Sequence, residues 1–341
     1  MKIMILGGTG VISRAIARLA LERGFEVSVV NRGQRKVDLD PRIRRLQADR
    51  TDPVRFRETL KGEKPDVVID MICFNPDDAR QTLEIFRQLA GHIIFTSSTA
   101  AYDRPYKSVP AREDLEKPLL TGDFAYGLDK AAMERFLFGE MGKPGAALTI
   151  IRPSLTFGAG SRNFGMLRQN YNVVQRIREK KPLVMVGEGM APWTFTYVDD
   201  LANGYLLACG NANTFDNHFQ VLNDEVMVWE DLYHLVGDLV GEKPILNYVP
   251  SSLLRELDDK LTGHLHHEKV HCSVFSIEKF QKAAPEFRPV HKFRDGLAKV
   301  IESWEQDGLG VDPVKDRLED DICACYAAFR DGLLKLKSDR K

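Results

Sequence analysis

The sequence predicts an α/β fold built on a doubly wound parallel sheet, with strands and helices alternating along the chain. Residues 3–6 form an apolar run that is bounded by glycine and too short to span a membrane, as in a strand buried on both faces. Apolar residues then recur at helical spacing over residues 12–19, and Gly24 provides a stop. A second apolar strand over residues 27–30 completes a βαβ unit, the building block of parallel sheets.

Three small residues mark the turn between the first strand and the first helix: Gly7, Gly10 and Ser13. In such a turn, missing side chains allow backbone N–H groups and the start of the helix to approach a pyrophosphate. A tight turn with no ligand is the alternative, but a glycine motif placed directly between a strand and a helix favours a dinucleotide site. Ser13 stands where a third glycine normally allows close packing, so a small displacement of the helix is expected.

The same alternation continues to about residue 95. The expected elements are a short strand over 44–48, a helix that begins near Pro53 with Asp52 as its cap, a strand over 65–73, a helix over 79–89 and a strand over 92–95. Ligands of doubly wound sheets bind beyond the carboxyl ends of the strands. The serine-rich segment directly after the strand over 92–95 is therefore the place to look for catalytic groups.

Composition excludes several classes of protein. The chain has 341 residues, a net charge of −1, 43% hydrophobic and 28% charged residues, which gives no basis for a general nucleic-acid or membrane-surface binder. No segment resembles a signal peptide or reaches transmembrane length, so a cytoplasmic protein is expected. The five cysteines form neither an even framework nor paired CxxC motifs, which favours reduced thiols and no metal site.

The choice of cofactor depends on the end of the second strand. A carboxylate at this point accepts a hydrogen bond from the ribose 2′-hydroxyl of NAD, but this chain has Asn31 followed by Arg32. Because a guanidinium can pair with the 2′-phosphate of NADP, the sequence favours NADP over NAD, with a solvated surface arginine as the alternative. Asp49 and Arg50 follow the short third strand, and Asp49 is a candidate acceptor for the adenine amino group.

A possible catalytic pair follows on the next expected helix. Tyr126 and Lys130 are four residues apart, so their side chains project from the same helical face. An ammonium beside a phenol favours the phenolate, which makes a tyrosine a better base. A hydroxyl from the serine-rich segment, on Ser98 or on its neighbour Ser97, can hold a substrate oxygen in line with that tyrosine. A solvated helix face is the alternative, but the position of the pair after a serine-rich strand end favours catalysis.

Together these motifs resemble the extended short-chain dehydrogenases/reductases, of the NAD-dependent epimerase/dehydratase family. The matching segments are GGTGVIS, FTSSTAAY, YGLDK, LTIIRPSLTFGAG and FTYVDDLA, and they cover residues 1 to about 230. The resemblance implies a Rossmann-type sheet in which Ser98 orients the substrate oxygen, Tyr126 is the acid/base, and Lys130 promotes its ionisation and holds the nicotinamide ribose. The cofactor contacts that it implies are Gly7, Gly10, Val11, Ile12, Asn31, Arg32, Asp49, Arg50, Tyr126 and Lys130.

Two departures from the family pattern bear on the substrate. Where sugar-nucleotide enzymes carry an asparagine and an arginine that serve the nucleotide sugar, this chain has Leu155 and Trp193, which supply neither the hydrogen bonds nor the charge. The resemblance implies redox chemistry at a secondary alcohol or ketone of a sugar or sugar-nucleotide-like substrate, with epimerisation through a keto intermediate expected. An NADP-dependent reductase or dehydrogenase of a non-nucleotide substrate is the alternative. A non-catalytic dinucleotide-sensing or RNA-binding protein on the same fold is a third hypothesis.

The second half of the chain alternates less regularly. We expect a dinucleotide-binding domain over 1–160 with segments near 195–230 packing back on it, a substrate-binding region over 161–310 and a C-terminal amphipathic helix over 311–341. Histidines between 264 and 271 lack the partners of a structural zinc site, so a solvated loop or one pocket-lining histidine is expected. The resemblance also implies a homodimer, because helices over 79–89 and 126–138 correspond to those that pair in related enzymes.

Overall fold

A computed structural model of the protein describes residues 1–35, 37–162, 164–257 and 263–338, with the backbone only for 337 and 338. The chain divides into two compact units. Unit 1 comprises Met1–Thr156, Thr194–Asp224 and Phe275–His291, and unit 2 comprises Phe157–Trp193, Glu225–Val274 and the residues from Lys292 onward. Segments distant in sequence therefore contribute to each unit.

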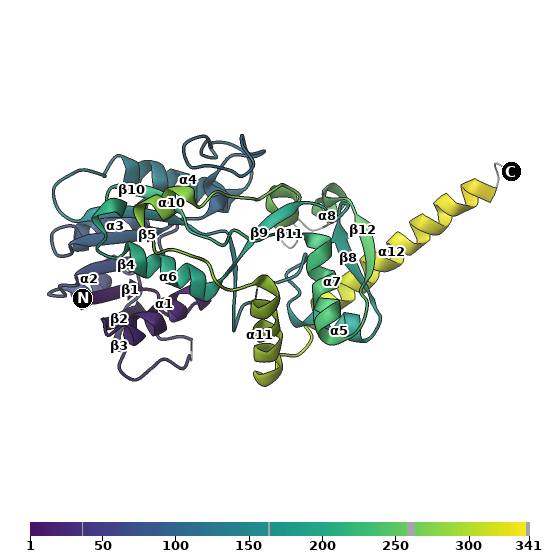
Figure 1. Ribbon diagram of the computed structural model, residues 1–341, viewed down its shortest axis with the longest axis horizontal. Helices are drawn as coiled ribbons and strands as arrows, with labels where there is room; N and C mark the ends of the chain where they lie inside the picture. Colours follow the sequence, from purple (N-terminus) through teal and green to yellow (C-terminus); the bar gives the residue numbers. More distant parts are fainter. Residues whose placement is uncertain (36, 163, 258–262, 339–341) are drawn as a thin grey trace. The chain divides into compact units, whose positions relative to one another are not determined.

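Unit 1 contains a seven-stranded sheet of order β10-β6-β5-β4-β1-β2-β3 (Figure 1). Its strands are β1 (Lys2–Leu6), β2 (Glu26–Asn31), β3 (Arg44–Gln47), β4 (Val67–Asp70), β5 (His92–Thr96), β6 (Ala147–Arg152) and β10 (Asn217–Gln220). All neighbouring pairs run parallel. The strand order reverses at β1, which lies between β2 and β4, and doubly wound sheets bind ligands at this switch point. The predicted doubly wound parallel sheet is confirmed.

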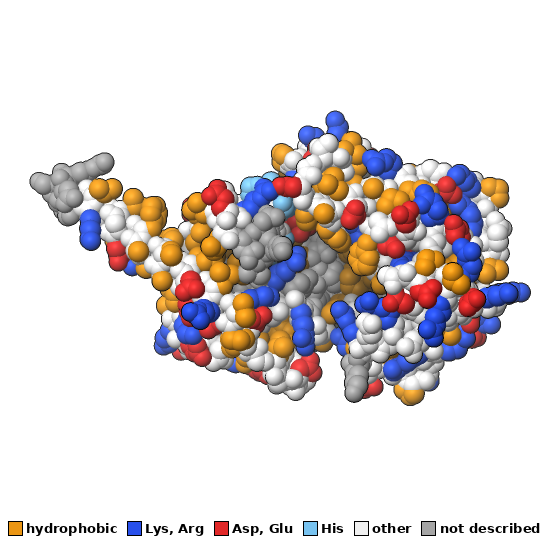
Figure 2. All heavy atoms as spheres, turned by 180° about the vertical axis from the view of Figure 1, so that it is seen from behind, with side chains coloured by type: hydrophobic (Ala, Val, Ile, Leu, Met, Phe, Trp, Pro, Cys, Tyr) orange, Lys and Arg blue, Asp and Glu red, His pale blue; other side chains and the backbone are white. Residues whose placement is uncertain are grey.

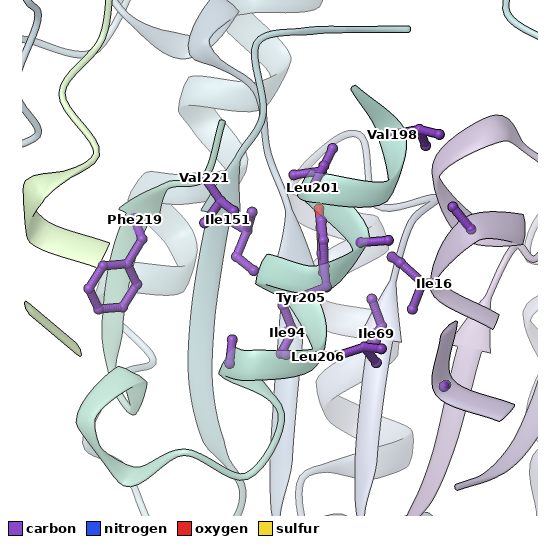
Figure 3. Close-up of a cluster of buried hydrophobic side chains, with 14 of the residues drawn as sticks. Ile16, Ile69, Ile94, Ile151, Val198, Leu201, Tyr205, Leu206, Phe219 and Val221 are labelled. Atoms are coloured by element: carbon purple, nitrogen blue, oxygen red, sulfur yellow. The ribbon is translucent and has the colours of Figure 1, made fainter. Parts of the chain in front are cut away.

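Helices cover both faces of this sheet. The helices of unit 1 are α1 (Val11–Glu22), α2 (Pro53–Leu60), α3 (Pro76–Phe86), α4 (Ala125–Phe138), α6 (Val198–Ala208) and α10 (Glu278–Ala283), with short 3₁₀ turns η1 (Thr99–Ala101) and η2 (Ala212–Thr214). Alternate residues of β1 belong to different apolar clusters, Ile3 and Ile5 to one, Met4 and Leu6 to the other, as the period of two in a strand requires. Figure 3 shows the first cluster, in which Leu201, Tyr205 and Leu206 of α6 lie against strand residues such as Ile69 and Ile94.

Two helix starts illustrate how local sequence sets the elements around the site. The side chain of Asp52 accepts a hydrogen bond from Arg55 N at 3.1 Å and caps α2, which confirms it as the cap of that helix. Asn75 does the same for α3, accepting from Asp78 N at 2.9 Å. Because a polar cap followed by proline is a start signal, α3 begins at Pro76, three residues before the predicted position.

Unit 2 combines a two-stranded sheet with several helices, and its strands β8 (Pro182–Val186) and β12 (Ile245–Val249) pair in parallel. A three-stranded sheet has the order β11-β9-β7. Its strand β11 (Val226–Val228) belongs to unit 2, whereas the unit boundaries fall within β9 (Pro192–Tyr197) and β7 (Leu155–Phe157). The helices are α5 (Tyr171–Arg178), α7 (Trp229–Val240), α8 (Ser251–Leu257), the π-helical turn η3 (Leu265–Lys269), α11 (Phe293–Gln306) and α12 (Pro313–Ser338).

The C-terminal helix α12 changes character along its length. Its first half packs on β8 and β12, where Glu319 is fully buried and accepts a hydrogen bond from Val184 N at 2.8 Å. Its second half exposes a group of large apolar side chains, seen as orange spheres along the helix in Figure 2: Phe329, Leu333, Leu334 and Leu336. Among the described residues no helix is long and apolar enough to cross a bilayer, and no three His, Cys, Asp or Glu side chains converge as metal ligands.

Candidate functional site at the carboxyl edge of the sheet

The glycine turn after β1 is set by close backbone packing. Gly7 N donates to Val30 O of β2 at 2.7 Å, and Gly7 and Gly8 have φ of 118° and 88°, a region that favours glycine. A Cβ on Gly8 would lie 2.5 Å from Cβ of Val29, so no other residue fits there. Gly7 and Gly10 were predicted from the sequence to form this turn, whereas the tightest contact belongs to Gly8. Its position in the run of two glycines was the available signal.

The first turn of α1 explains why Ser13 is accommodated. The Ser13 hydroxyl accepts from Gly10 N at 3.0 Å and donates to Gly10 O at 3.2 Å, and the residue is 3% exposed. Val11 and Ile12 follow in half-buried positions, and this first turn carries no acidic residue. Backbone N–H groups at the start of a helix have no intrahelical acceptor, so they are available to an anion. The glycine turn and α1 therefore fit a dinucleotide pyrophosphate.

The end of β2 brings together the residues predicted to select the cofactor. The Asn31 side chain accepts from Gly33 N at 2.9 Å, which shapes the turn that carries the exposed Arg32. The pKa of Asp49 is lowered, mainly by hydrogen bonds from the Thr51 backbone and hydroxyl, with a smaller contribution from the charge of Arg32. Asn31, Arg32 and Asp49 thus lie in one neighbourhood beside the glycine turn.

Arg50 has a different environment. Its side chain is only 9% exposed, and its Nη2 donates to Asp70 Oδ2 at 2.8 Å and to Thr82 Oγ1 at 2.7 Å. Its Nη1 donates to Ile72 O at 2.6 Å. These contacts tie the loop after β3 to the end of β4 and to α3, so the guanidinium of Arg50 has protein partners of its own.

Tyr126 and Lys130 lie on α4 in contrasting environments. Tyr126 is 43% exposed, whereas Lys130 is 2% exposed. Lys130 Nζ donates to Cys73 O at 2.6 Å, in the loop after β4, and to Thr96 O at 2.8 Å, at the end of β5. The ammonium also lies 6.0 Å from the centre of the Tyr126 ring. Burial lowers the pKa of Lys130, while the carbonyl oxygens satisfy its N–H groups.

The segment that contains Ser98 packs against the first turn of α4. Ser98 is half-buried and its hydroxyl accepts from Ala100 N at 3.1 Å, which starts the turn η1. A Cβ on Gly127 would lie 2.6 Å from Ala100 O, so η1 and the first turn of α4 touch backbone to backbone. The structure thereby brings Ser98 close to the Tyr126 end of α4. Ser97 is 2% exposed and its hydroxyl has no hydrogen-bond partner in the described part of the chain.

A buried ion pair holds the other end of α4. Arg152 Nε and Nη2 donate to the two carboxylate oxygens of Glu134 at 2.7 and 2.6 Å, and both side chains are at most 4% exposed. Arg152 Nη1 also donates to the hydroxyl of Tyr102 at 2.8 Å. This pair was not predicted from the sequence. The signal was the position of Glu134 four residues after Lys130, on the same face of the helix.

A doubly wound sheet with a glycine turn at its switch point is the architecture of dinucleotide-dependent enzymes. A family model described as the NAD dependent epimerase/dehydratase family matches residues 3–221, and the chain belongs to this family. The expected membership among the extended short-chain dehydrogenases/reductases is confirmed, and with it an NAD-dependent oxidoreductase scaffold.

Individual relatives show the breadth of this family. The chain is similar to "2′-dehydrokanamycin reductase" of Streptomyces kanamyceticus, with 24% identity over 303 residues that span 89% of this chain and 83% of the relative. It is also similar to "Chloroplast stem-loop binding protein of 41 kDa b" of Arabidopsis thaliana, with 24% identity over 269 residues, 73% of this chain and 66% of the relative. Among solved structures, UDP-glucose 4-epimerase of Thermotoga maritima superposes with a TM-score of 0.72 at 19% identity, over 90% of this chain and 99% of that one.

Proposed function

We propose that this protein is an NAD(P)-dependent oxidoreductase acting on a secondary alcohol or ketone of a sugar-like substrate. The observation that carries the proposal is the arrangement of α4, in which a buried ammonium at the carboxyl edge of the sheet lies below an exposed phenol. Lys130 makes two carbonyl hydrogen bonds there and Tyr126 remains accessible. Burying a lysine costs free energy, because desolvation disfavours the charged ammonium. A buried lysine at this edge therefore indicates a functional role.

Each residue then has a defined task. The nicotinamide supplies or accepts the hydride at the substrate carbon when it is bound. Tyr126 exchanges the proton of the substrate oxygen, and the fixed charge of Lys130 favours the phenolate form in which it accepts that proton. Ser98, at the start of η1, donates to the same oxygen and holds it in line with the tyrosine. Ser97 is the less suitable alternative, because its hydroxyl is buried.

The substrate is more consistent with a sugar that lacks a nucleotide. Trp193, at the place of the arginine in sugar-nucleotide enzymes, is 6% exposed, and its Nε1 donates to His271 O at 2.9 Å. It also packs edge-on against Trp229 at 5.3 Å between ring centres. A side chain used in this way offers nothing to a diphosphate. The chain is also similar to a protein named 2′-dehydrokanamycin reductase. Together these observations favour NADP-dependent reduction, and epimerisation through a keto intermediate is the second candidate.

Two measurements separate these candidates. Denaturing the purified protein and identifying the released nucleotide by mass spectrometry tests for a resident cofactor, which an epimerase needs and a reductase must exchange. NADPH consumption with a panel of keto-sugars and keto-aminoglycosides then tests for reduction. We expect Tyr126→Phe to lower turnover about a hundredfold or more without loss of fold, with Tyr171→Phe as a control at a tyrosine of α5. Unchanged turnover in Tyr126→Phe would exclude Tyr126 as the acid/base.

The proposal includes NADP as the preferred cofactor. Arg32 is exposed at the end of β2, where a 2′-phosphate would meet its guanidinium. We expect Arg32→Ala to weaken NADP binding by about 1–3 kcal/mol and NAD binding much less, as measured by calorimetric titration. Equal weakening of both nucleotides, or a wild-type preference for NAD, would contradict this assignment. Tight, salt-sensitive RNA binding without any redox activity would instead support the non-catalytic hypothesis.

A further inference from the structure

Arg14 is a half-buried cation of α1 whose Nε points away from solvent. It is the fourth residue of α1, directly after the turn that contains Gly10. Within the described part of the chain its guanidinium makes no hydrogen bond or ion pair, and its Nε is inaccessible to solvent with no acceptor. A buried N–H without an acceptor costs about as much as a lost hydrogen bond, and in native proteins such a group usually indicates a water or an ion that completes it.

The other arginines of this helix region behave differently. Arg18, one turn further along α1, donates to Asp199 Oδ1 at 2.6 Å and to Glu22 Oε1 at 2.9 Å. Arg23, just after the helix, donates to the side chain of Asn203 at 2.5 Å. Both are therefore satisfied by protein groups on α1 or α6. Arg14 differs from them in lying next to the glycine turn.

Helix geometry directs the Arg14 side chain toward that turn. Side chains of an α-helix tilt toward its N-terminus and lie over the residue four positions earlier, which for Arg14 is Gly10. The first turn of α1 has no acidic residue that would neutralise an arginine there. The hydroxyl of Ser13 is already used by the backbone of Gly10. No side chain of this first turn thus supplies the acceptor for Arg14 Nε, and an anion held at the glycine turn would supply it.

We infer that Arg14 binds a phosphate group of the dinucleotide, together with Arg32. Arg32 lies beside the glycine turn because β2, which ends before it, pairs with β1 and Gly7 N donates to Val30 O, and Arg14 follows the turn in the first turns of α1. A guanidinium recognises phosphate through paired N–H donors, and a buried Nε strengthens such a contact. This inference rests on the proposed function, since it takes the glycine turn as the cofactor site. It adds a cofactor-binding residue that the cofactor contacts predicted from the sequence did not include.

The test compares three variants by calorimetric titration with NADP, NAD and adenosine 2′,5′-bisphosphate. Arg14→Gln should raise the Kd for NADP roughly ten- to a hundredfold, the effect of losing a charge-assisted pair, and Arg14→Lys should show a smaller loss. Arg18→Gln, on the same helix, should bind like the wild type. Loss for NADP and the bisphosphate but not NAD assigns the contact to the 2′-phosphate, and equal loss for NADP and NAD assigns it to the pyrophosphate.

A stability measurement separates ligand binding from a structural role. Because Arg14 has no hydrogen bond or ion pair to lose among the described residues, Arg14→Gln should leave the Tm of the ligand-free protein unchanged. The upward shift in Tm that NADP produces should shrink. A lower Tm without ligand, together with unchanged nucleotide affinity, would overturn the inference, as would equal weakening in Arg18→Gln. If the wild-type protein binds none of the nucleotides, the proposed function itself fails. If the wild type binds them and Arg14→Gln binds equally well, only the role of Arg14 fails.

Discussion

Replacing Gly127 by alanine tests whether close contact between η1 and α4 sets the position of the catalytic tyrosine. In an ordinary helix interior this change stabilises a protein by about 1 kcal/mol, because alanine has the higher helix propensity. Here the added Cβ would lie 2.6 Å from Ala100 O, 2.7 Å from Phe124 Cδ1 and 2.8 Å from Leu119 Cδ2. The two side chains can rotate away, but the backbone carbonyl of η1 cannot.

The size of the effect follows from the displacement that this contact requires. Ordinary contacts of a Cβ begin at 3.4 Å, so η1 and α4 must separate by about 0.8 Å, the difference between 3.4 and 2.6 Å. Overpacking of this kind costs about 1–3 kcal/mol, which exceeds the gain in propensity. We therefore expect Gly127→Ala to lower the free energy of unfolding by about 1–2 kcal/mol. Since Tyr126 moves with the helix, turnover should fall roughly ten- to a hundredfold.

Urea denaturation measures the stability, and NADPH consumption with an accepted ketone measures the turnover. Gly139→Ala is the matched control at the other end of α4, because its φ of −72° suits alanine and its nearest non-neighbour atom is a carbonyl oxygen 3.4 Å away. This control should be neutral or slightly stabilising. A Gly127→Ala protein that is more stable than the wild type and turns over normally would refute the reasoning, because propensity alone would then account for the site.

Three further predictions concern stability and assembly. Burial lowers the pKa of His92 to about 4, so the unfolded chain binds a proton at a higher pH than the folded chain does. The free energy of unfolding should therefore fall by roughly 3 kcal/mol as the pH falls from 6.5 toward 4. In urea denaturation at pH 4.5 and 7, His92→Gln should show a smaller difference in the free energy of unfolding than the wild type. Arg152→Met leaves the buried carboxylate of Glu134 unpaired and should cost about 3–5 kcal/mol, whereas Arg112→Met, in an exposed pair, should cost under about 1 kcal/mol; similar losses would contradict this contrast. We also propose a homodimer that forms through α3 and α4. Light scattering of the wild type should then give twice the 38.6 kDa chain mass, and Ala132→Arg should give the mass of one chain. A monomeric wild type would contradict the proposed homodimer.

Local sequence determined much of this protein. The apolar run of β1, the helical spacing after Gly10 and the cap at Asp52 are properties of neighbouring residues, so they can be predicted without knowledge of the rest of the fold. The Tyr126–Lys130 spacing likewise places both side chains on one helical face, whatever that helix packs against. The doubly wound sheet and the motifs at its carboxyl edge followed from these signals.

Only the tertiary structure decided how those residues are used. The two acceptors of Lys130 are the carbonyls of Cys73, in the loop after β4, and Thr96, at the end of β5, and nothing near residue 130 encodes that pairing. The same holds for Arg50, whose guanidinium is held by Asp70, and for Gly127, which is required because a carbonyl of η1 lies against it. Such contacts join residues tens of positions apart, and packing of the whole sheet with its helices brings them within hydrogen-bonding or van der Waals distance.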